Sequence, residues 1–215
     1  KPIFDPFCGS GTVLLQGWKN GYDVYGNDLS PYAYVLTLGK MYPYKSEEEA
    51  QQALRKYEKR IKSRASSISL DNVPSWVQEF YDPSTLREIL ACVYYFKRYK
   101  EWFLLSALLG IMHHQRPAFL SYPASQNRGV YNKDIATMRL SNIPSGTIIT
   151  SPPYMRSLTY ARDNRLRLWF LGLEDWALLD NKISPVRNDF IELMQTSIKK
   201  WASYQEQGAR CVLVV

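Results

Sequence analysis

The stretch that decides the fold of this chain is an acidic, glycine-containing segment near its start: Asp5-Pro6-Phe7-Cys8-Gly9-Ser10-Gly11-Thr12. A short apolar run over residues 2–4 precedes it, and a helical pattern over residues 12–19 follows, ending at Gly21. Residues 22–26 have the pattern of a second strand. A strand, a glycine-dependent turn, a helix and another strand are typical of an α/β fold with parallel strands.

The chemistry of this glycine turn separates it from two other nucleotide-binding loops. A phosphate-binding loop has lysine before its final Ser or Thr, whereas no lysine precedes Thr12 and Val13 follows it. A dinucleotide-binding loop needs a third glycine near the helix start, and residues 13–16 contain none. Asp5 would repel a pyrophosphate but attract the positively charged end of a cofactor that carries an amino acid. The turn therefore favours a cofactor of that kind.

Asp28 comes just after the second predicted strand. A carboxylate at this position can accept hydrogen bonds from both hydroxyls of a ribose. An acidic residue there is also often a helix cap, although Ser30 would serve that purpose as well. Because Asp28 follows the glycine turn, we favour the ribose-binding role.

The rest of the chain predicts one sheet interrupted by helices. Helices are expected from Ser30 to about Met41, from Ser46 to Arg64, and over several segments up to about Met112. Strands are expected at residues 130–132, 147–150 and 210–215, the last as a buried parallel strand. We predict an α/β domain over residues 1–42 and 129–215, with a truncated sheet and a helical insertion over residues 43–128.

The most informative stretch follows the strand predicted at residues 147–150 and reads Ser151-Pro152-Pro153-Tyr154. Two prolines remove two backbone N–H donors and stiffen the chain, which leaves the carbonyl groups around Ser151 and Pro152 as free acceptors. A carbonyl and a hydroxyl can hold the two protons of an amino group, and Tyr154 can stack on the ring that carries it. The alternative is a rigid exit from the sheet with a packed tyrosine.

Asp5 to Thr12 and Thr150-Ser151-Pro152-Pro153-Tyr154 together resemble the motifs of the amino-methylating DNA methyltransferases. The resemblance covers roughly the first 42 and the last 86 residues, and implies a Rossmann-like S-adenosylmethionine-dependent methyltransferase fold. It implies that the catalytic residues are Ser151, Pro152, Pro153 and Tyr154. The implied cofactor-binding residues are Asp5, Pro6, Phe7, Cys8, Gly9, Ser10, Gly11, Thr12, Asp28, Leu29, Asp134 and Ser151.

The resemblance implies direct methyl transfer from S-adenosylmethionine to the exocyclic amino group of a base flipped out of double-stranded DNA. Serine at position 151 resembles the cytosine-N4 branch, whereas adenine-N6 enzymes more often carry Asp or Asn there. An adenine-N6 enzyme and an RNA methyltransferase are alternatives. A third is a non-catalytic DNA-binding subunit that needs a partner chain, because these residues do not account for all of the family's strands and pocket segments. A homodimer is a further expected arrangement.

Composition adds a preference for an acidic partner. The chain has 27 Lys and Arg against 20 Asp and Glu, and the net charge of +7 favours a polyanion such as DNA. The basic helix over residues 46–64 and the polar loop over residues 116–128 are candidate target-recognition surfaces, although a solvated charged face explains the helix equally well. Cys8, Cys92 and Cys211 form no disulfide or zinc pattern, which predicts a cytoplasmic protein with Cys8 packed.

Two classes of site are not expected from the sequence. No apolar run approaches the length of a membrane span, so no membrane partner is expected. His113 and His114 are adjacent and have no third ligand nearby in sequence, so no metal site is expected.

Overall fold

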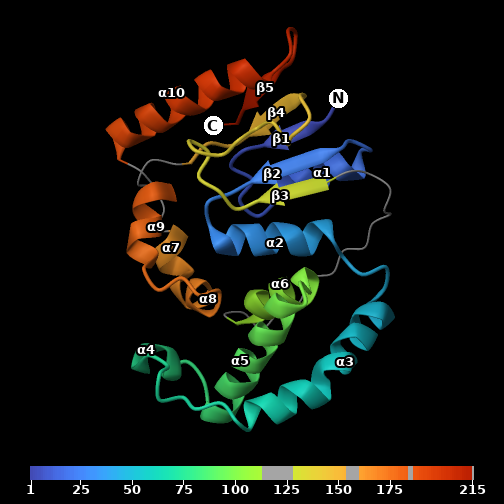
Figure 1. The fold of residues 1–215 in the computed structure, drawn as a ribbon, viewed down its shortest axis with the longest axis vertical. Helices are drawn as coiled ribbons and strands as arrows, with labels where there is room; N and C mark the ends of the chain where they lie inside the picture. Colours follow the sequence, from blue (N-terminus) through green and yellow to red (C-terminus); the bar gives the residue numbers. More distant parts are fainter. Residues whose placement is uncertain (113–127, 154–159, 184–185, 215) are drawn as a thin grey trace.

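Parallel strands form one central sheet in the computed structural model of this chain, which describes residues 1–112, 128–153, 160–183 and 186–214 (Figure 1). Their spatial order is β3-β2-β1-β4-β5, and β1 pairs with β2 on one side and β4 on the other. The strands are β1 (Ile3–Asp5), β2 (Val24–Asn27), β3 (Arg128–Tyr131), β4 (Thr147–Thr150) and β5 (Cys211–Leu213). This arrangement confirms the predicted Rossmann-like α/β architecture.

One face of the sheet is covered by α1 (Thr12–Lys19) and α2 (Pro31–Met41). Successive side chains on a strand point to opposite faces, so Ile3 and Val24 supply this layer. They pack with Leu14 and Trp18 of α1 and with Met41 of α2. Helix α1 has the predicted bounds, and Gly21 lies in the left-handed region behind it with φ of 85°.

The opposite face is covered by α10 (Arg187–Tyr204), which lies above the sheet in Figure 1. Phe4, Tyr25 and Ile148 point to this side and pack with Met194 and Trp201 of α10. Apolar residues of the irregular segment between β3 and β4 complete the layer: Ile135, Met138, Leu140 and Ile143. Both faces of the sheet are therefore buried, as parallel sheets require.

A separate helical core lies at the end of the molecule away from the sheet (Figure 1). It is built from α3 (Glu47–Ala65), α4 (Ser75–Gln78), α5 (Pro83–Arg98) and α6 (Trp102–Ile111). Helix α8 (Arg165–Phe170), which follows β4, adds Leu166 and Phe170 to the same core. The helical core therefore includes residues of α8, which lies outside the insertion predicted over residues 43–128.

Helices α7 (Tyr160–Asp163) and α9 (Trp176–Ile183) join α8 beside the sheet (Figure 1). The Asp180 carboxylate of α9 accepts the backbone N–H of Ala161 in α7 over 3.0 Å. Among the described helices, none has both the length and the apolarity needed to cross a membrane.

The final strand differs from its sequence-based description. The prediction of a buried strand is wrong, because β5 lies at the edge of the sheet with β4 as its neighbour. Val212 is 45% exposed and Val214, just after the strand, is 52% exposed. An apolar run predicts a strand, but its burial depends on what packs against it. The second strand also starts later than predicted, at Val24, and continues to Asn27.

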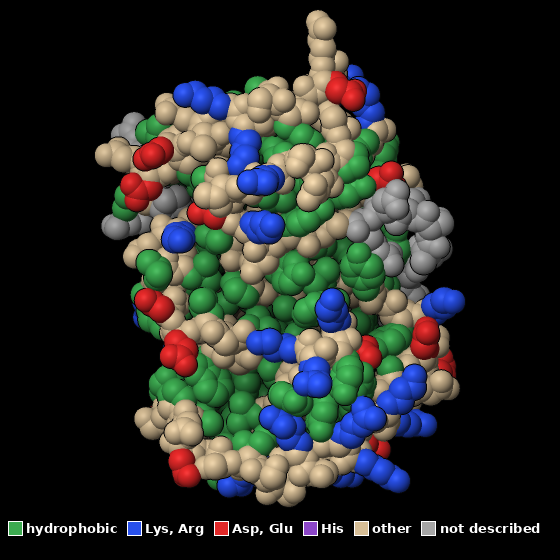
Figure 2. Space-filling model, in the orientation of Figure 1, with side chains coloured by type: hydrophobic (Ala, Val, Ile, Leu, Met, Phe, Trp, Pro, Cys, Tyr) green, Lys and Arg blue, Asp and Glu red, His purple; other side chains and the backbone are tan. Residues whose placement is uncertain are grey.

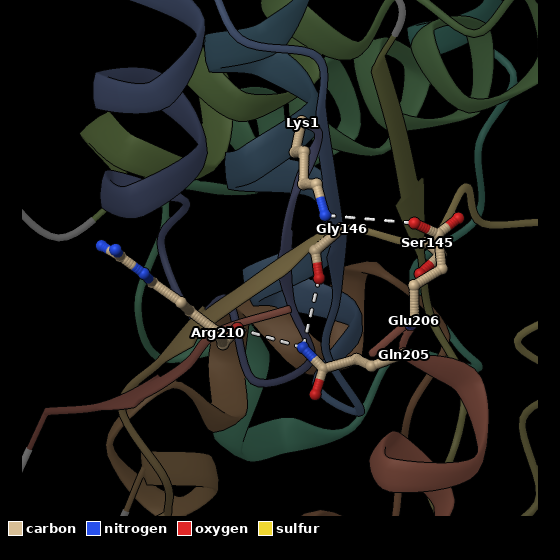
Figure 3. Close-up of polar contacts among 6 residues, drawn as sticks. All are labelled: Lys1, Ser145, Gly146, Gln205, Glu206 and Arg210. Carbon is tan, nitrogen blue, oxygen red and sulfur yellow. Dashed lines mark hydrogen bonds and ion pairs between the residues drawn. The ribbon is translucent and has the colours of Figure 1, made fainter. Parts of the chain in front are cut away.

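Polar contacts hold together the edge at which β4 and β5 begin (Figure 3). The Gln205 amide donates to the carbonyl oxygen of Gly146 over 3.1 Å, and the Glu206 N–H donates to the Ser145 hydroxyl over 3.0 Å. The Lys1 ammonium lies 4.0 Å from the Glu206 carboxylate. Because these contacts lie at the amino ends of the strands, they stabilise the edge opposite the site described next.

Candidate active site

A cavity of about 760 Å³ lies at the carboxyl ends of β1, β2 and β4. Loops converge at this edge of a parallel sheet, and the volume is typical of small-molecule sites. Most of the residues predicted from the sequence line it: Asp5, Phe7, Cys8, Gly9, Ser10, Thr12, Asp28, Leu29, Asp134, Ser151, Pro152 and Pro153. The fold thus brings the glycine turn and the Ser-Pro-Pro turn, which are far apart in sequence, to one cavity.

Three predicted site residues are not among the described residues that line the cavity. Pro6 and Gly11 are not among the lining residues, and Tyr154 lies outside the described residues. The Pro6 carbonyl oxygen accepts a hydrogen bond from the Asn27 amide over 3.2 Å. Gly11 stands immediately before α1 with φ of 78°. Pro6 and Gly11 therefore belong to the turn without lining the cavity.

Glycine is required in the turn for two physical reasons. Gly9 and Gly11 both have positive φ, 50° and 78°, in the region that disfavours other residues. A Cβ atom at Gly11 would lie 2.7 Å from the Thr37 hydroxyl oxygen, which is too close. The Gly11 N–H also donates to the Cys8 carbonyl oxygen over 2.7 Å and closes the turn.

The Asp28 carboxylate ties the turn to the loop after β2. One oxygen accepts the Gly9 N–H and the other accepts the Ser30 N–H, both over 2.8 Å. Ser30 is the N-cap of α2, since its hydroxyl accepts the Ala33 N–H over 3.4 Å. Asp28 is therefore not the cap. Each carboxylate oxygen has a further lone pair for a ligand hydroxyl, and burial raises the Asp28 pKa above its ordinary value.

Asp5 is a second buried carboxyl group in the cavity wall. It is 2% exposed, and burial raises its pKa from 3.8 to about 7. The Phe7 N–H donates to it over 3.2 Å and opposes that shift, whereas the nearby Asp28 charge reinforces it. A cationic ligand group next to Asp5 would favour its ionised form.

Asn27 is a structurally important residue that the sequence analysis did not single out. It is 1% exposed at the end of β2, and its amide donates to the carbonyl oxygens of Pro6 and Lys133 over 3.2 and 3.0 Å. Its own oxygen accepts the Lys133 N–H over 3.1 Å. One amide thus joins the end of β2 to the loops that follow β1 and β3. A polar residue at the end of a buried strand is the signal that could have identified it.

Lys133 and Asp134 form the wall that follows β3. The Asp134 side chain accepts the N–H of Ala136 over 2.9 Å, and its backbone carbonyl accepts those of Thr137 and Met138. These bonds fix the turn that places Asp134 on the cavity.

The Ser-Pro-Pro turn leaves β4 toward the cavity. The Ser151 hydroxyl donates to the carbonyl oxygen of Val214, next to β5, over 3.0 Å. The Val214 N–H donates in turn to the Thr150 carbonyl oxygen over 2.9 Å. Pro152 is buried, and within the described residues nothing donates to its carbonyl oxygen. The edge strand therefore fixes the orientation of Ser151.

The far wall of the cavity comes from α2, α7, α9 and α10. The residues there that the sequence analysis did not name include Tyr32, Tyr160, Asn164, Asn181, Asp189 and Glu192. Arg167, which is 7% exposed, contacts two of these residues, Asn164 and Tyr32. Its guanidinium donates to the Asn164 amide oxygen over 2.9 Å and lies 5.1 Å from the Tyr32 ring centroid. It also donates to the carbonyl oxygen of Leu109 in α6 over 2.8 Å.

Cys8 has the environment of a packing residue. Its side chain is 5% exposed, and burial raises the thiol pKa well above its ordinary value. Reactive cysteines need the opposite shift, because the thiolate is the nucleophile. Among the described residues no group of three His, Cys, Asp or Glu side chains could hold a metal ion, and His113 and His114 lie outside that part of the chain.

Comparison with known proteins found a partial similarity. A stretch of 43 residues is 42% identical to the type II methyltransferase M.MvaI of Kocuria varians. It covers 20% of this chain and 10% of that protein. No family model matches the chain, and no solved structure matches it. The similarity to that methyltransferase is therefore local and spans a small part of either chain.

Proposed function

We propose that this chain is an S-adenosylmethionine-dependent DNA methyltransferase that modifies an exocyclic amino group, with N4 of cytosine as its target. One observation carries the proposal: a single cavity is lined by the glycine turn, by Asp28 and by the Ser-Pro-Pro turn. The partial similarity to a type II methyltransferase supports the same class of reaction.

The residues at the glycine-turn end of the cavity fit S-adenosylmethionine. Asp28 is buried beside the turn and has lone pairs available for the two ribose hydroxyls. Asp5 is a buried carboxyl group suited to the cationic amino-acid end, and Asp134 lies on the wall proposed for the adenine. When bound, S-adenosylmethionine would supply an electrophilic methyl group.

The Ser-Pro-Pro turn would hold the amino group of the target base. Because the Ser151 proton is already donated to Val214, the hydroxyl oxygen would act toward an amine as an acceptor. The Pro152 carbonyl oxygen would accept the second amine proton. Two acceptors at fixed positions would orient the nitrogen lone pair, and such positioning replaces a bimolecular encounter with an oriented one.

The choice of cytosine rests on the resemblance of Ser151-Pro152-Pro153-Tyr154 to the cytosine-N4 branch. Base flipping belongs to the same proposal, because an amine within a stacked duplex could not reach a turn that lines a cavity. The predicted stacking role of Tyr154 belongs to the same proposal.

Calorimetric titration of S-adenosylmethionine and S-adenosylhomocysteine into the purified chain tests the cofactor assignment. We expect binding by the parent chain and at least about a tenfold loss in Asp28→Asn, because one carboxylate acceptor is replaced by an amide donor. Asp71→Asn, at an exposed carboxylate outside the cavity, is the matched control and should bind as the parent does. Absence of binding by a folded parent chain would overturn the assignment.

Product analysis tests the target. The chain is incubated with duplex DNA and S-adenosylmethionine, and the nucleosides are identified by mass spectrometry after digestion. N4-methylcytosine is expected. N6-methyladenine, or methylation of an RNA substrate alone, would contradict the cytosine assignment and leave the methyltransferase assignment in place.

A further inference from the structure

Helices α3 and α5 carry a basic, tyrosine-rich surface at the end of the molecule opposite the sheet. Figure 2 shows Lys and Arg side chains gathering over this part of the molecule. Between Arg55 and Arg64, α3 has six cationic side chains and one carboxylate, Glu58. In the described part of the chain, none of these cations is within an ion-pair distance of a carboxylate. We call the surface formed by Arg64, Tyr94, Arg98 and Tyr99 the α3–α5 face.

Two arginines of the α3–α5 face meet at one tyrosine. The Arg64 guanidinium carbon lies 3.5 Å from the centroid of the Tyr94 ring, and Tyr94 is 38% exposed. Arg98, one helical turn away on α5, donates to the Tyr94 hydroxyl over 3.4 Å. Both guanidinium groups thus contact the same side chain, one at the face of its ring and the other at its hydroxyl.

Further tyrosines pack around the Tyr94 ring that both cations contact, and the Tyr95 ring centroid lies 5.2 Å from that of Tyr94. The Tyr95 and Tyr99 rings are stacked with 8° between their planes, and Tyr57 of α3 packs beside Tyr99. The Tyr57 hydroxyl donates to the Glu101 carboxylate over 2.8 Å, which holds it in place. A guanidinium stacked on a ring loses little further freedom when it binds, and its planar donors match a phosphate.

From this arrangement we infer that the α3–α5 face binds phosphates of duplex DNA, with Arg64 and Arg98 as the main contacts and Tyr94 as the residue that positions them. The inference rests on the proposed function for the choice of DNA as the partner. The contacts are to the backbone and therefore independent of base sequence. The residues of the α3–α5 face do not line the cavity in which the target base would be modified.

The test measures binding of a fluorescent duplex of mixed sequence by anisotropy, between about 50 and 200 mM salt. In Arg64→Gln/Arg98→Gln, two phosphate contacts are lost, so the slope of log affinity against log salt should become less negative by about 1.8. We expect affinity at low salt to fall by about tenfold or more. The control Arg139→Gln/Lys199→Gln removes two exposed cations from the sheet part and should keep the parent slope.

A second variant separates positioning from charge. Tyr94→Leu keeps both arginines but removes the ring, so the salt slope should stay near that of the parent while affinity falls. Tyr22→Leu, at a tyrosine that is 46% exposed in the sheet part, is the control. Thermal unfolding of each variant shows whether it is folded, and Arg98→Gln alone, at an exposed side chain, gives half the slope change if the double variant does not fold.

Several outcomes would overturn the inference. They are a parent chain that binds no duplex, an unchanged slope in the Arg64 and Arg98 variants, an equal change in the control, and tighter binding to an RNA duplex than to DNA. The cofactor titration is independent of these results. If the chain binds the cofactor but the salt slope of the Arg64 and Arg98 variants is unchanged, only the inference about the α3–α5 face fails. If the salt slope changes but the chain binds no cofactor, only the proposed function fails.

Discussion

The Thr37 hydroxyl donates a hydrogen bond to the carbonyl oxygen of Gly9 over 3.0 Å. The same side chain occupies the space that a Cβ atom at Gly11 would need. Thr37 is fully buried in α2, so through this side chain the helix packs against the glycine turn. A residue well separated in sequence therefore holds the turn in place.

Replacement of Gly11 by alanine should destabilise the protein by about 2–4 kcal/mol, because both φ and the contact with Thr37 oppose a side chain. Gly208 is a matched control: its φ is 81° and no atom lies within 4 Å of the added Cβ. Gly208→Ala should cost about 1–2 kcal/mol. Urea unfolding measures both values, and equal losses would show that the contact with Thr37 is relaxed at little cost.

The stability of the protein should depend on the ionisation of Asp5. Its folded-state pKa of about 7 lies above the ordinary 3.8, so the folded chain binds the proton more tightly than the unfolded chain. The resulting stabilisation is full below pH 3.8 and is lost as pH rises to about 7. Between pH 5 and 8, this contribution should fall by about 2–3 kcal/mol.

Asp5→Asn isolates that effect. The unfolding free energy of parent and variant is measured by urea at several pH values. As pH rises, the parent should lose stability relative to the variant. S-adenosylmethionine affinity of the parent should increase over the same range, because ionised Asp5 attracts a cation. A parent and variant with parallel pH profiles would contradict the raised pKa.

Ser151→Ala should lower kcat for methyl transfer by about 100-fold, since one of the two proposed amine acceptors is lost. Cofactor affinity should change much less. Ser145→Ala is a suitable control, because Ser145 also hydrogen-bonds a backbone group near one end of β4 but lies at the opposite edge of the sheet. Equal kcat values for the two variants would remove Ser151 from the proposed site.

Cysteine labelling should separate the packed thiol from the accessible one. Cys211 is exposed on β5, whereas Cys8 is buried with a raised thiol pKa. An alkylating reagent at pH 8 should therefore modify Cys211 first, and Cys8→Ala should retain methyl transfer with some loss of stability. Loss of activity in Cys8→Ala with an unchanged melting temperature would instead indicate a chemical role for the thiol.

Local sequence patterns determined the architecture and many of the cavity residues. The glycine turn, the capped start of α3 at Ser46 and the apolar run at residues 147–150 each depend on residues close together in sequence. Such patterns act through φ preferences, caps and alternation, which operate over one or two turns of chain. They identified Asp28 and Ser151 as site candidates but not the bonds that orient them.

Tertiary structure alone decided the remaining features, because they depend on which distant segments meet. Asn27 links the loops that follow β1 and β3 only because β2 lies between these two strands. Arg167 reached Tyr32 and Leu109 only because α8 packs into the helical core. The exposure of β5 follows from its position at the sheet edge. Burial and partner choice are set by packing between segments, which residue type and local spacing do not encode.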